Sequence, residues 1–215
     1  MKRCLALVVF GVFLLSAHTA MAGQFGSATP TEGVNIGGGY LYSSADLDVG
    51  DATLKQNLVY IRLGAGLSEN FEVYVRGGVA DLEIESYDDS AAPYVGGGLK
   101  ALFMERRNFK LGGFVDGDFF SDYDNNDLEV SSLYEINAGL NLETEIEGAK
   151  LYAGPVFYVR EMDIEAAGES ETVEEDGNIG GFVGASWKVK DRININAEVQ
   201  FKTDFSGGIE ILYNF

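Results

Sequence analysis

The residues that could do chemistry are mainly carboxylates, because the chain has one His, His18, and one Cys, Cys4, both close to its start. The rest of the chain therefore cannot assemble a Ser-His-Asp, Cys-His or zinc-histidine arrangement. Asp116 and Asp118 are two residues apart, so a strand would place both on one face, as a proton-exchanging carboxylate pair needs. We favour ion pairing with Lys or Arg for these two, and we expect no enzyme.

A second group, of three aspartates and one asparagine, has part of the spacing of a metal site. Asp122, Asp124, Asn126 and Asp127 match the start of a calcium-binding loop. Such a loop has Gly at its sixth position and Glu at its twelfth, where this chain has Asp127 and Leu133. We therefore expect no resident cofactor, and loosely bound Ca²⁺ or Mg²⁺ at acidic loops is the open alternative.

The elements that must position these residues are strands, because apolar and polar residues alternate along most of the chain. Short turns alternate with longer connections, the longest of which spans residues 161–177. Beyond Ala80 the apolar positions shift to Leu82 and Ile84, which predicts a bulge or an exit from a membrane. We predict an all-β fold, a single antiparallel up-and-down β-barrel of about ten strands, with eight as the alternative. The strands lie near residues 34–42, 59–67, 71–80, 94–103, 109–119, 134–143, 150–160, 178–189, 193–202 and 208–215.

The last strand carries the most specific pattern in the chain. Ile209, Ile211, Tyr213 and Phe215 alternate with more polar residues, and the sequence ends on the aromatic Phe215. This ending resembles the C-terminal signature of bacterial outer-membrane β-barrels, which the barrel-assembly machinery reads. The whole pattern resembles small barrels of the outer-membrane protein A and opacity-protein type, so the resemblance implies a transmembrane barrel and an outer-membrane surface protein.

Alternation alone does not say which face of a barrel meets solvent, because a soluble lipocalin-type barrel also alternates. The strands have the length that a tilted membrane strand needs, so we expect the apolar face to meet lipid and the polar face to line the lumen. Charges inside a narrow lumen must pair. The expected lumen network consists of Arg62, Glu72, Arg76, Lys100, Asp116, Asp118, Glu135, Arg160, Glu198 and Lys202.

The first 22 residues read as a secretory signal peptide, with Lys2 and Arg3, a short apolar stretch and a small-residue cleavage site at Ala20-Met21-Ala22. The domain prediction is a signal peptide at 1–22, a short periplasmic lead at 23–32 and the barrel at 33–215. After cleavage neither His nor Cys remains, so no disulfide staples the exported chain.

The formal net charge is −19, and the acidic residues gather in the longer connections, near residues 46–51, 81–89, 122–129 and 161–176. Such a surface would repel nucleic acid. We expect outer-membrane lipid, lipopolysaccharide and the barrel-assembly machinery as partners, and a monomer. Divalent cations could bridge the acidic loops to lipopolysaccharide.

The predicted function is a structural or surface-interaction role in the outer membrane, with a polar, largely plugged lumen, extracellular acidic loops and a periplasmic C-terminus. One alternative is a narrow porin for small solutes or ions. A second is an adhesin or receptor that binds through its loops.

Overall fold

The computed structural model describes residues 25, 27–31, 33–48, 52–84, 87–125, 128–166 and 169–215. The signal peptide predicted for residues 1–22 lies outside the described residues, as do positions 23, 24, 26 and 32 of the predicted lead. The described part of the chain holds no helix with the length and hydropathy needed to cross a bilayer.

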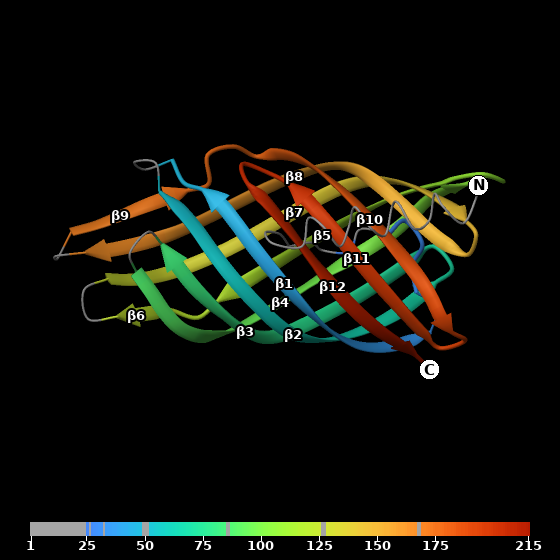
Figure 1. Cartoon of the computed structure of the whole chain (residues 1–215), viewed down its shortest axis with the longest axis horizontal. Helices are drawn as coiled ribbons and strands as arrows, with labels where there is room; N and C mark the ends of the chain where they lie inside the picture. Colours follow the sequence, from blue (N-terminus) through green and yellow to red (C-terminus); the bar gives the residue numbers. More distant parts are fainter. Residues whose placement is uncertain are drawn as a thin grey trace, which may run out of the picture.

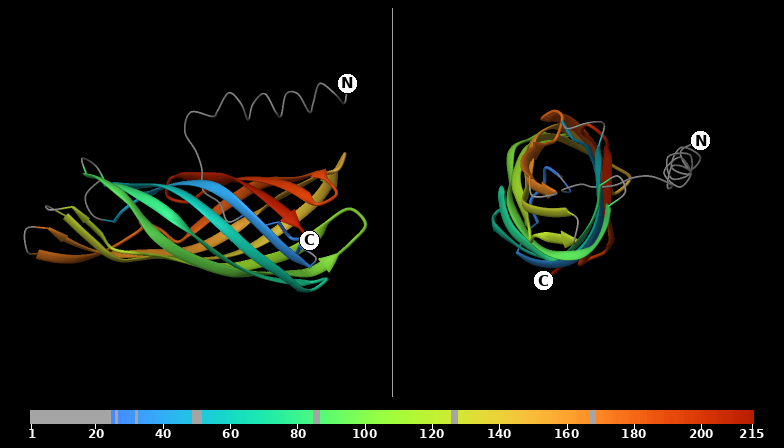
Figure 2. Two further views of the ribbon diagram at one scale, coloured as in Figure 1. Left: turned by 90° about the horizontal axis from the view of Figure 1, so that it is seen from below. Right: turned by 90° about the vertical axis from the view of Figure 1, so that its left-hand side faces the viewer.

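Ten of the twelve strands in the described ranges close into one antiparallel barrel, with the neighbour order β7-β5-β4-β3-β2-β1-β12-β11-β10-β8 and back to β7 (Figures 1 and 2). This confirms the predicted fold class, with ten strands rather than eight in the ring. The strands are β1 (Val34–Asp46), β2 (Thr53–Ser68), β3 (Phe71–Ile84), β4 (Tyr87–Glu105), β5 (Lys110–Phe120), β6 (Tyr123–Asn125), β7 (Leu128–Ile146), β8 (Ala149–Ala166), β9 (Glu169–Glu174), β10 (Ile179–Lys190), β11 (Ile193–Phe201) and β12 (Phe205–Asn214).

The two ends of the barrel differ. At the end near the C-terminus, tight turns join the strands, and Glu147 and Gly148 both have positive φ, 53° and 84°, as a two-residue type I′ hairpin turn requires. At the opposite end the strands from β1 to β9 run on past β10, β11 and β12, and β6 and β9 add to the edges of β7 and β8 (Figure 1). We call these the short-turn end and the extended end.

The sequence prediction of long loops is wrong at the extended end. The span 161–177, predicted as the longest loop, is the end of β8 followed by β9, and the two strands pair from Glu161↔Glu174 to Ala166↔Glu169. The reason is visible in the burial: Met162 and Val173 are 1% and 2% exposed. β8 and β9 continue as strands because they place these apolar side chains inside the barrel.

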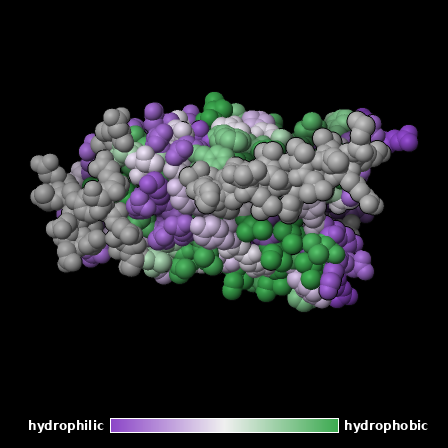
Figure 3. Space-filling model, viewed as in Figure 1, coloured by the Kyte–Doolittle hydropathy of each residue, from purple (hydrophilic) through white to green (hydrophobic). Residues whose placement is uncertain are grey.

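Around the middle and the short-turn end, the barrel is apolar outside and polar inside, as predicted. Figure 3 shows hydrophobic residues gathered toward the C-terminal end of this face, with hydrophilic residues on either side. The outward apolar belt includes Val59, Ile61, Leu63, Val75, Val95, Val115, Phe119, Ile136, Leu140, Phe157, Val159, Val183, Ile209 and Ile211, all more than one-third exposed. Such a belt is typical of a surface that meets hydrocarbon rather than water.

At the extended end this polarity is reversed. In β3 the buried side chains stay on the same alternate positions from Arg76 to Ala80, Leu82 and Ile84, while the outward positions change from Val79 to Asp81 and Glu83. Beyond Ala80 the outer face of β3 therefore meets a polar environment, which is the predicted exit. The irregularity in the register between β3 and β4 lies in the facing strand, β4.

The inward apolar residues of the extended end form one cluster, which we call the apolar cap: Leu47, Leu54, Leu82, Ile84, Ala92, Tyr123, Val130, Leu133, Met162 and Val173. A bulge in β7 helps to build it. Ser132 has a φ of 56°, and the register with β8 shifts between Ser131 and Tyr134. The extra residue lets Val130 and Leu133 both face inward.

Candidate functional site

The candidate site is the lumen, where charged side chains form a continuous cross-strand row. Arg62 is paired with Arg76, Arg76 with Gly96, Gly96 with Asp118, Asp118 with Glu135 and Glu135 with Arg160. Each charged residue of this row is at most 8% exposed. Alternation places every one of them on the inner face, so the sheet register itself brings the charges together.

Arg62 holds the network toward the short-turn end. Its guanidinium donates to Glu72 at 2.5 Å and to Glu210 at 3.2 Å. It also lies over the ring of Tyr74, 4.2 Å from the ring centroid. Tyr60 donates to Glu210 as well, at 3.2 Å. One arginine thus pairs with two carboxylates from strands on either side of it, and buried charges require such partners.

Arg76 binds Asp118 in a two-pronged ion pair, through Nε at 2.8 Å and through Nη2. Asp116 has separate partners, accepting hydrogen bonds from the Tyr74 hydroxyl at 3.0 Å and from the Asn137 amide at 3.3 Å. The two aspartates are therefore on one face, but each is engaged by its own donors. The ion pairing predicted for both is therefore seen for Asp118, whereas Asp116 is held by the neutral donors Tyr74 and Asn137.

Gly96 makes the Arg76–Asp118 pair sterically feasible, because it leaves space between them in the row. A Cβ at position 96 would stand 1.8 Å from a carboxylate oxygen of Asp118 and 2.8 Å from the carbonyl oxygen of Gly117. Any side chain there would push the aspartate away from the arginine. The sequence suggested only that such glycines relieve crowding.

We expect Gly96→Ala to destabilise the barrel by roughly 1–3 kcal/mol, the usual cost of overpacking. Gly77→Ala is the matched control on β3, because the nearest atom to its added Cβ would be the Tyr94 carbonyl oxygen at 3.7 Å. Urea unfolding of the two variants in detergent micelles, followed by the fluorescence of Trp187, measures the difference. Equal midpoints would contradict the steric role of Gly96.

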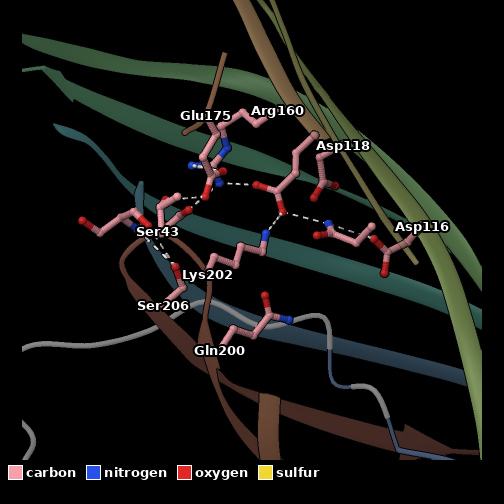
Figure 4. A network of polar contacts seen from close by, with 12 residues as sticks. Ser43, Asp116, Asp118, Arg160, Glu175, Gln200, Lys202 and Ser206 are labelled. Atoms are coloured by element: carbon pink, nitrogen blue, oxygen red, sulfur yellow. Dashed lines mark hydrogen bonds and ion pairs between the residues drawn. The ribbon is translucent and has the colours of Figure 1, made fainter. Parts of the chain in front are cut away.

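Glu135 is the junction of the network toward the extended end, and two of its partners, Arg160 and Lys202, are labelled in Figure 4. It accepts hydrogen bonds from Arg160, from Lys202 at 2.5 Å and from the Asn137 amide at 2.8 Å. Arg160 also donates to Ser43 at 2.6 Å. Two cations, one on β8 and one just after β11, thus meet on one carboxylate.

Arg160 has a second acidic neighbour that the sequence placed in an extracellular loop. Glu175 is 6% exposed, lies 3.7 Å from Arg160 Nη1 and accepts a hydrogen bond from Thr203 at 2.7 Å. Its burial has no sequence signal, since it sits among exposed acidic residues. The sequence analysis also left Glu143 out of the network.

Lys100 and Glu198 complete the ten residues expected in the lumen, and the structure places all ten on the inner side of the barrel. Glu198 accepts a hydrogen bond from Gln200 at 3.0 Å. Lys100 donates to the backbone carbonyl oxygen of Phe25, which belongs to the segment before the first strand. That segment was not expected in the lumen.

The described part of the N-terminal lead, residues 25 and 27–31, lies against the inner wall of the barrel. Ser27 and Thr29 donate to Glu143 at 3.0 Å and 2.5 Å through their hydroxyls. The backbone N–H of Thr29 reaches the same carboxylate at 3.2 Å. The lead turns inward because the inner wall offers it charged partners and an apolar site for Phe25, which is 3% exposed.

The contacts of the lead and the cost of ordering it are of similar size. Five hydrogen bonds, three of them to Glu143, join it to charged side chains of the wall. Such a bond contributes about 1.5–3 kcal/mol. Fixing the backbone of one residue costs about 1–2 kcal/mol, and six residues of the lead are described. The lead is therefore held more weakly than the hydrogen-bonded strands around it.

The carboxylates at the extended end point outward and are spread over its surface. Asp122 and Asp124 are exposed on either side of the buried Tyr123 in β6, and Asn126 and Asp127 lie outside the described residues. A strand does not converge its side chains as a calcium loop does. Among the residues that the structure describes, no group of three or more His, Cys, Asp or Glu could hold a metal ion.

One basic residue, Lys55, stands among these outward carboxylates. It donates to Glu83 at 3.0 Å, and this hydrogen bond, together with the charge of Glu83, raises the pKa of the Lys55 ammonium. Both side chains are more than two-fifths exposed. Solvent screens such a pair, so it adds little to stability.

The four residues of the C-terminal signature lie on the outer face of β12. Ile209, Ile211, Tyr213 and Phe215 are 45%, 53%, 37% and 70% exposed. The backbone of Phe215 donates to Val34 at 3.0 Å, so the chain end is held against the start of β1. β12 pairs with β1 and β11, and thus closes the ring.

No protein-family model matches the sequence, and no curated protein matches it. The structure is similar to the translocator domain of the autotransporter NalP from Neisseria meningitidis, with a TM-score of 0.50 and 10% identity over 100% of this chain and 96% of that one. It is also similar to an outer-membrane channel from Pseudomonas putida F1, with a TM-score of 0.51 and 12% identity over 92% of this chain and 100% of that one. At such identities the likeness shows the fold alone, that of outer-membrane β-barrels. The narrower resemblance to the outer-membrane protein A and opacity type stays a prediction.

Proposed function

We propose that the protein is an integral outer-membrane β-barrel with a plugged lumen, and that its extended end works as a structural or surface-interaction element. The single observation that carries this is the outward belt of large apolar side chains around an interior of paired charges. A soluble barrel has the opposite arrangement. A lipid environment makes both halves of the pattern favourable.

A migration assay tests the proposed membrane barrel. The purified protein in detergent should run faster on an SDS gel unheated than after boiling, because an intact barrel resists SDS. It should also insert into phospholipid vesicles and float with them. An unheated sample that runs with the boiled one, or that stays in the aqueous fraction, would contradict the proposal.

The proposed orientation places the extended end outside the cell and the short-turn end, with the C-terminus, in the periplasm. The support is that short turns and longer outer segments are the usual arrangement in such barrels. A glutamate-specific protease added to intact cells should cut near the exposed Glu129 and Glu171 and leave Glu105 and Glu147 intact. Cleavage confined to the second pair would reverse the orientation.

The proposed partners follow from the same surfaces. The apolar belt contacts lipid, and the C-terminal signature at Ile209, Ile211, Tyr213 and Phe215 is presented to the barrel-assembly machinery. The acidic extended end faces lipopolysaccharide, with Ca²⁺ or Mg²⁺ bound loosely between them. We propose a monomer that binds no nucleic acid and catalyses no reaction.

A narrow porin is the second candidate, and the fold it shares with an outer-membrane channel is the observation in its favour. The lumen opposes it, because three arginine-centred ion-pair groups, the lead and the apolar cap all lie inside the ring of strands. Stable single-channel steps in a planar bilayer would favour the porin. We expect none under conditions in which the protein is inserted.

An adhesin or receptor is the third candidate, favoured by the exposed carboxylates of the extended end. Deleting residues 161–177 would not test it cleanly, because that span supplies Met162 and Val173 to the apolar cap and Glu175 to Arg160. Replacing the outward Glu165 and Glu171 by Gln changes the surface and leaves the cap intact. Lost adhesion with an unchanged barrel would support this role.

A further inference from the structure

The lead is bound in the lumen as a ligand would be, through side chains of the wall. No strand in the described ranges pairs with residues 25–31. Its backbone groups are instead engaged by charged side chains: the Phe25 carbonyl oxygen by Lys100, the Thr29 N–H by Glu143 and the Thr31 N–H by Glu72, the last at 2.8 Å. Figure 2 shows the start of the described chain inside the ring of strands.

The wall recognises individual side chains of the segment as well. Both carboxylate oxygens of Glu143 are used, one by Ser27 and one by the hydroxyl of Thr29. Phe25 is packed in a cluster with Leu41, Leu58, Tyr60, Ala80 and Tyr94. The site therefore selects an aromatic side chain followed, two and four residues later, by hydroxyls.

The wall is also shaped to leave room for a backbone. A Cβ at Gly112 would stand 3.0 Å from both the Cα and the carbonyl oxygen of Ala28, and one at Gly208 would stand 3.4 Å from the Phe25 ring. A side chain at Gly112 would therefore crowd the segment, whereas a Cβ at Gly208 would only touch the Phe25 ring. Gly33, with a φ of +70°, joins the segment to β1, so it is attached to the barrel at a single point.

We infer that the half of the lumen nearest the short-turn end is a peptide-binding site, which takes an uncharged segment with an aromatic residue followed by alternating hydroxyl residues. Residues 25–31 occupy it in cis. Because they are held by side chains and one covalent joint, they can leave, and the site can then accept a peptide of the same chemistry from the short-turn side.

The test uses the full barrel without residues 25–31, in detergent micelles, and a fluorescently labelled synthetic peptide of residues 23–33. We expect saturable binding by fluorescence anisotropy, displaced by unlabelled peptide. A peptide with Thr29→Val, which loses the hydroxyl bond to Glu143, should bind at least about tenfold more weakly. A peptide with Phe25→Ala should be weakened at least as much, because it loses the buried ring.

The changes are in the peptide, so the fold of the barrel is the same in every measurement. Equal binding of all three peptides would mean adsorption to the micelle and would overturn the inference. No binding to a variant that still migrates as a heat-modifiable barrel would overturn it too. The unaltered chain should bind the peptide at least about tenfold more weakly, since its own segment competes at high effective concentration.

A full-length variant covers the case in which the deletion does not fold. Phe25→Ala with Thr29→Val keeps the segment but removes two of its three side-chain anchors, so this chain should bind the unaltered peptide more tightly than the wild type does. The inference needs the barrel but not the membrane. If the protein binds the peptide but fails to enter vesicles, the proposed membrane function is contradicted and the peptide-binding site is supported.

Discussion

Replacing Glu135 by Ala should destabilise the barrel more than any other single change in the lumen. Arg160 and Lys202 both donate to this carboxylate, and their side chains are each 3% exposed. Removing one partner of a buried ion pair costs about 3–5 kcal/mol, because the remaining charge is left uncompensated. Here Lys202 loses its carboxylate and Arg160 keeps only the more distant Glu175, at 3.7 Å, so we expect an effect near the top of that range.

The measurement is equilibrium unfolding in urea, in detergent micelles, with the fluorescence of the single tryptophan, Trp187, as the signal. The matched control is Glu83→Ala, which removes the acceptor of Lys55 from an ion pair at the surface. That variant should unfold with an unchanged midpoint, because water replaces the lost partner. If both variants unfold at the same urea concentration, the lumen network does not hold the walls together.

The ring of ten strands could be predicted from the sequence, because each strand has an apolar outer face and a polar inner face along most of its length. Alternation of Val59, Ile61 and Leu63 with Tyr60 and Arg62 is enough to place one face outward and the other inward. The same alternation predicts which charged residues face the lumen. It does not predict which of them form ion pairs, because pairing depends on the register between strands, as in the Arg76–Gly96–Asp118 row.

The strands of the extended end and the position of the lead could not be predicted from the sequence, for two different physical reasons. In the extended end the environment outside changes to a polar one, so Leu82 and Ile84 remain inward while their neighbours become acidic, and the same alternation looks like a loop. The lead has no alternation of apolar and polar residues that would mark a strand. Its position depends on Lys100 and Glu143, which lie far away in sequence.

The second large effect concerns the outward face, where Leu63→Arg should destabilise the barrel in lipid by roughly 2–4 kcal/mol. Leu63 lies at the centre of the outward apolar run of β2, from Val59 to Leu67, and is 52% exposed. A cation at that depth has no water to solvate it. Folding into phospholipid vesicles, measured as the urea dependence of the heat-resistant gel band, gives the free energy.

Leu67→Arg is the matched control, because it changes the same residue type on the same face of the same strand, at a position that is 63% exposed. Leu67 lies at the short-turn end of the run, where an arginine reaches the interface and costs about 0–1 kcal/mol. The difference between the two variants therefore measures depth in hydrocarbon and not the loss of leucine. In a barrel surrounded by water both substitutions would be equally harmless, and each would raise solubility without detergent. That result would show that Val59, Ile61 and Leu63 do not contact lipid, and it would contradict the proposed outer-membrane function.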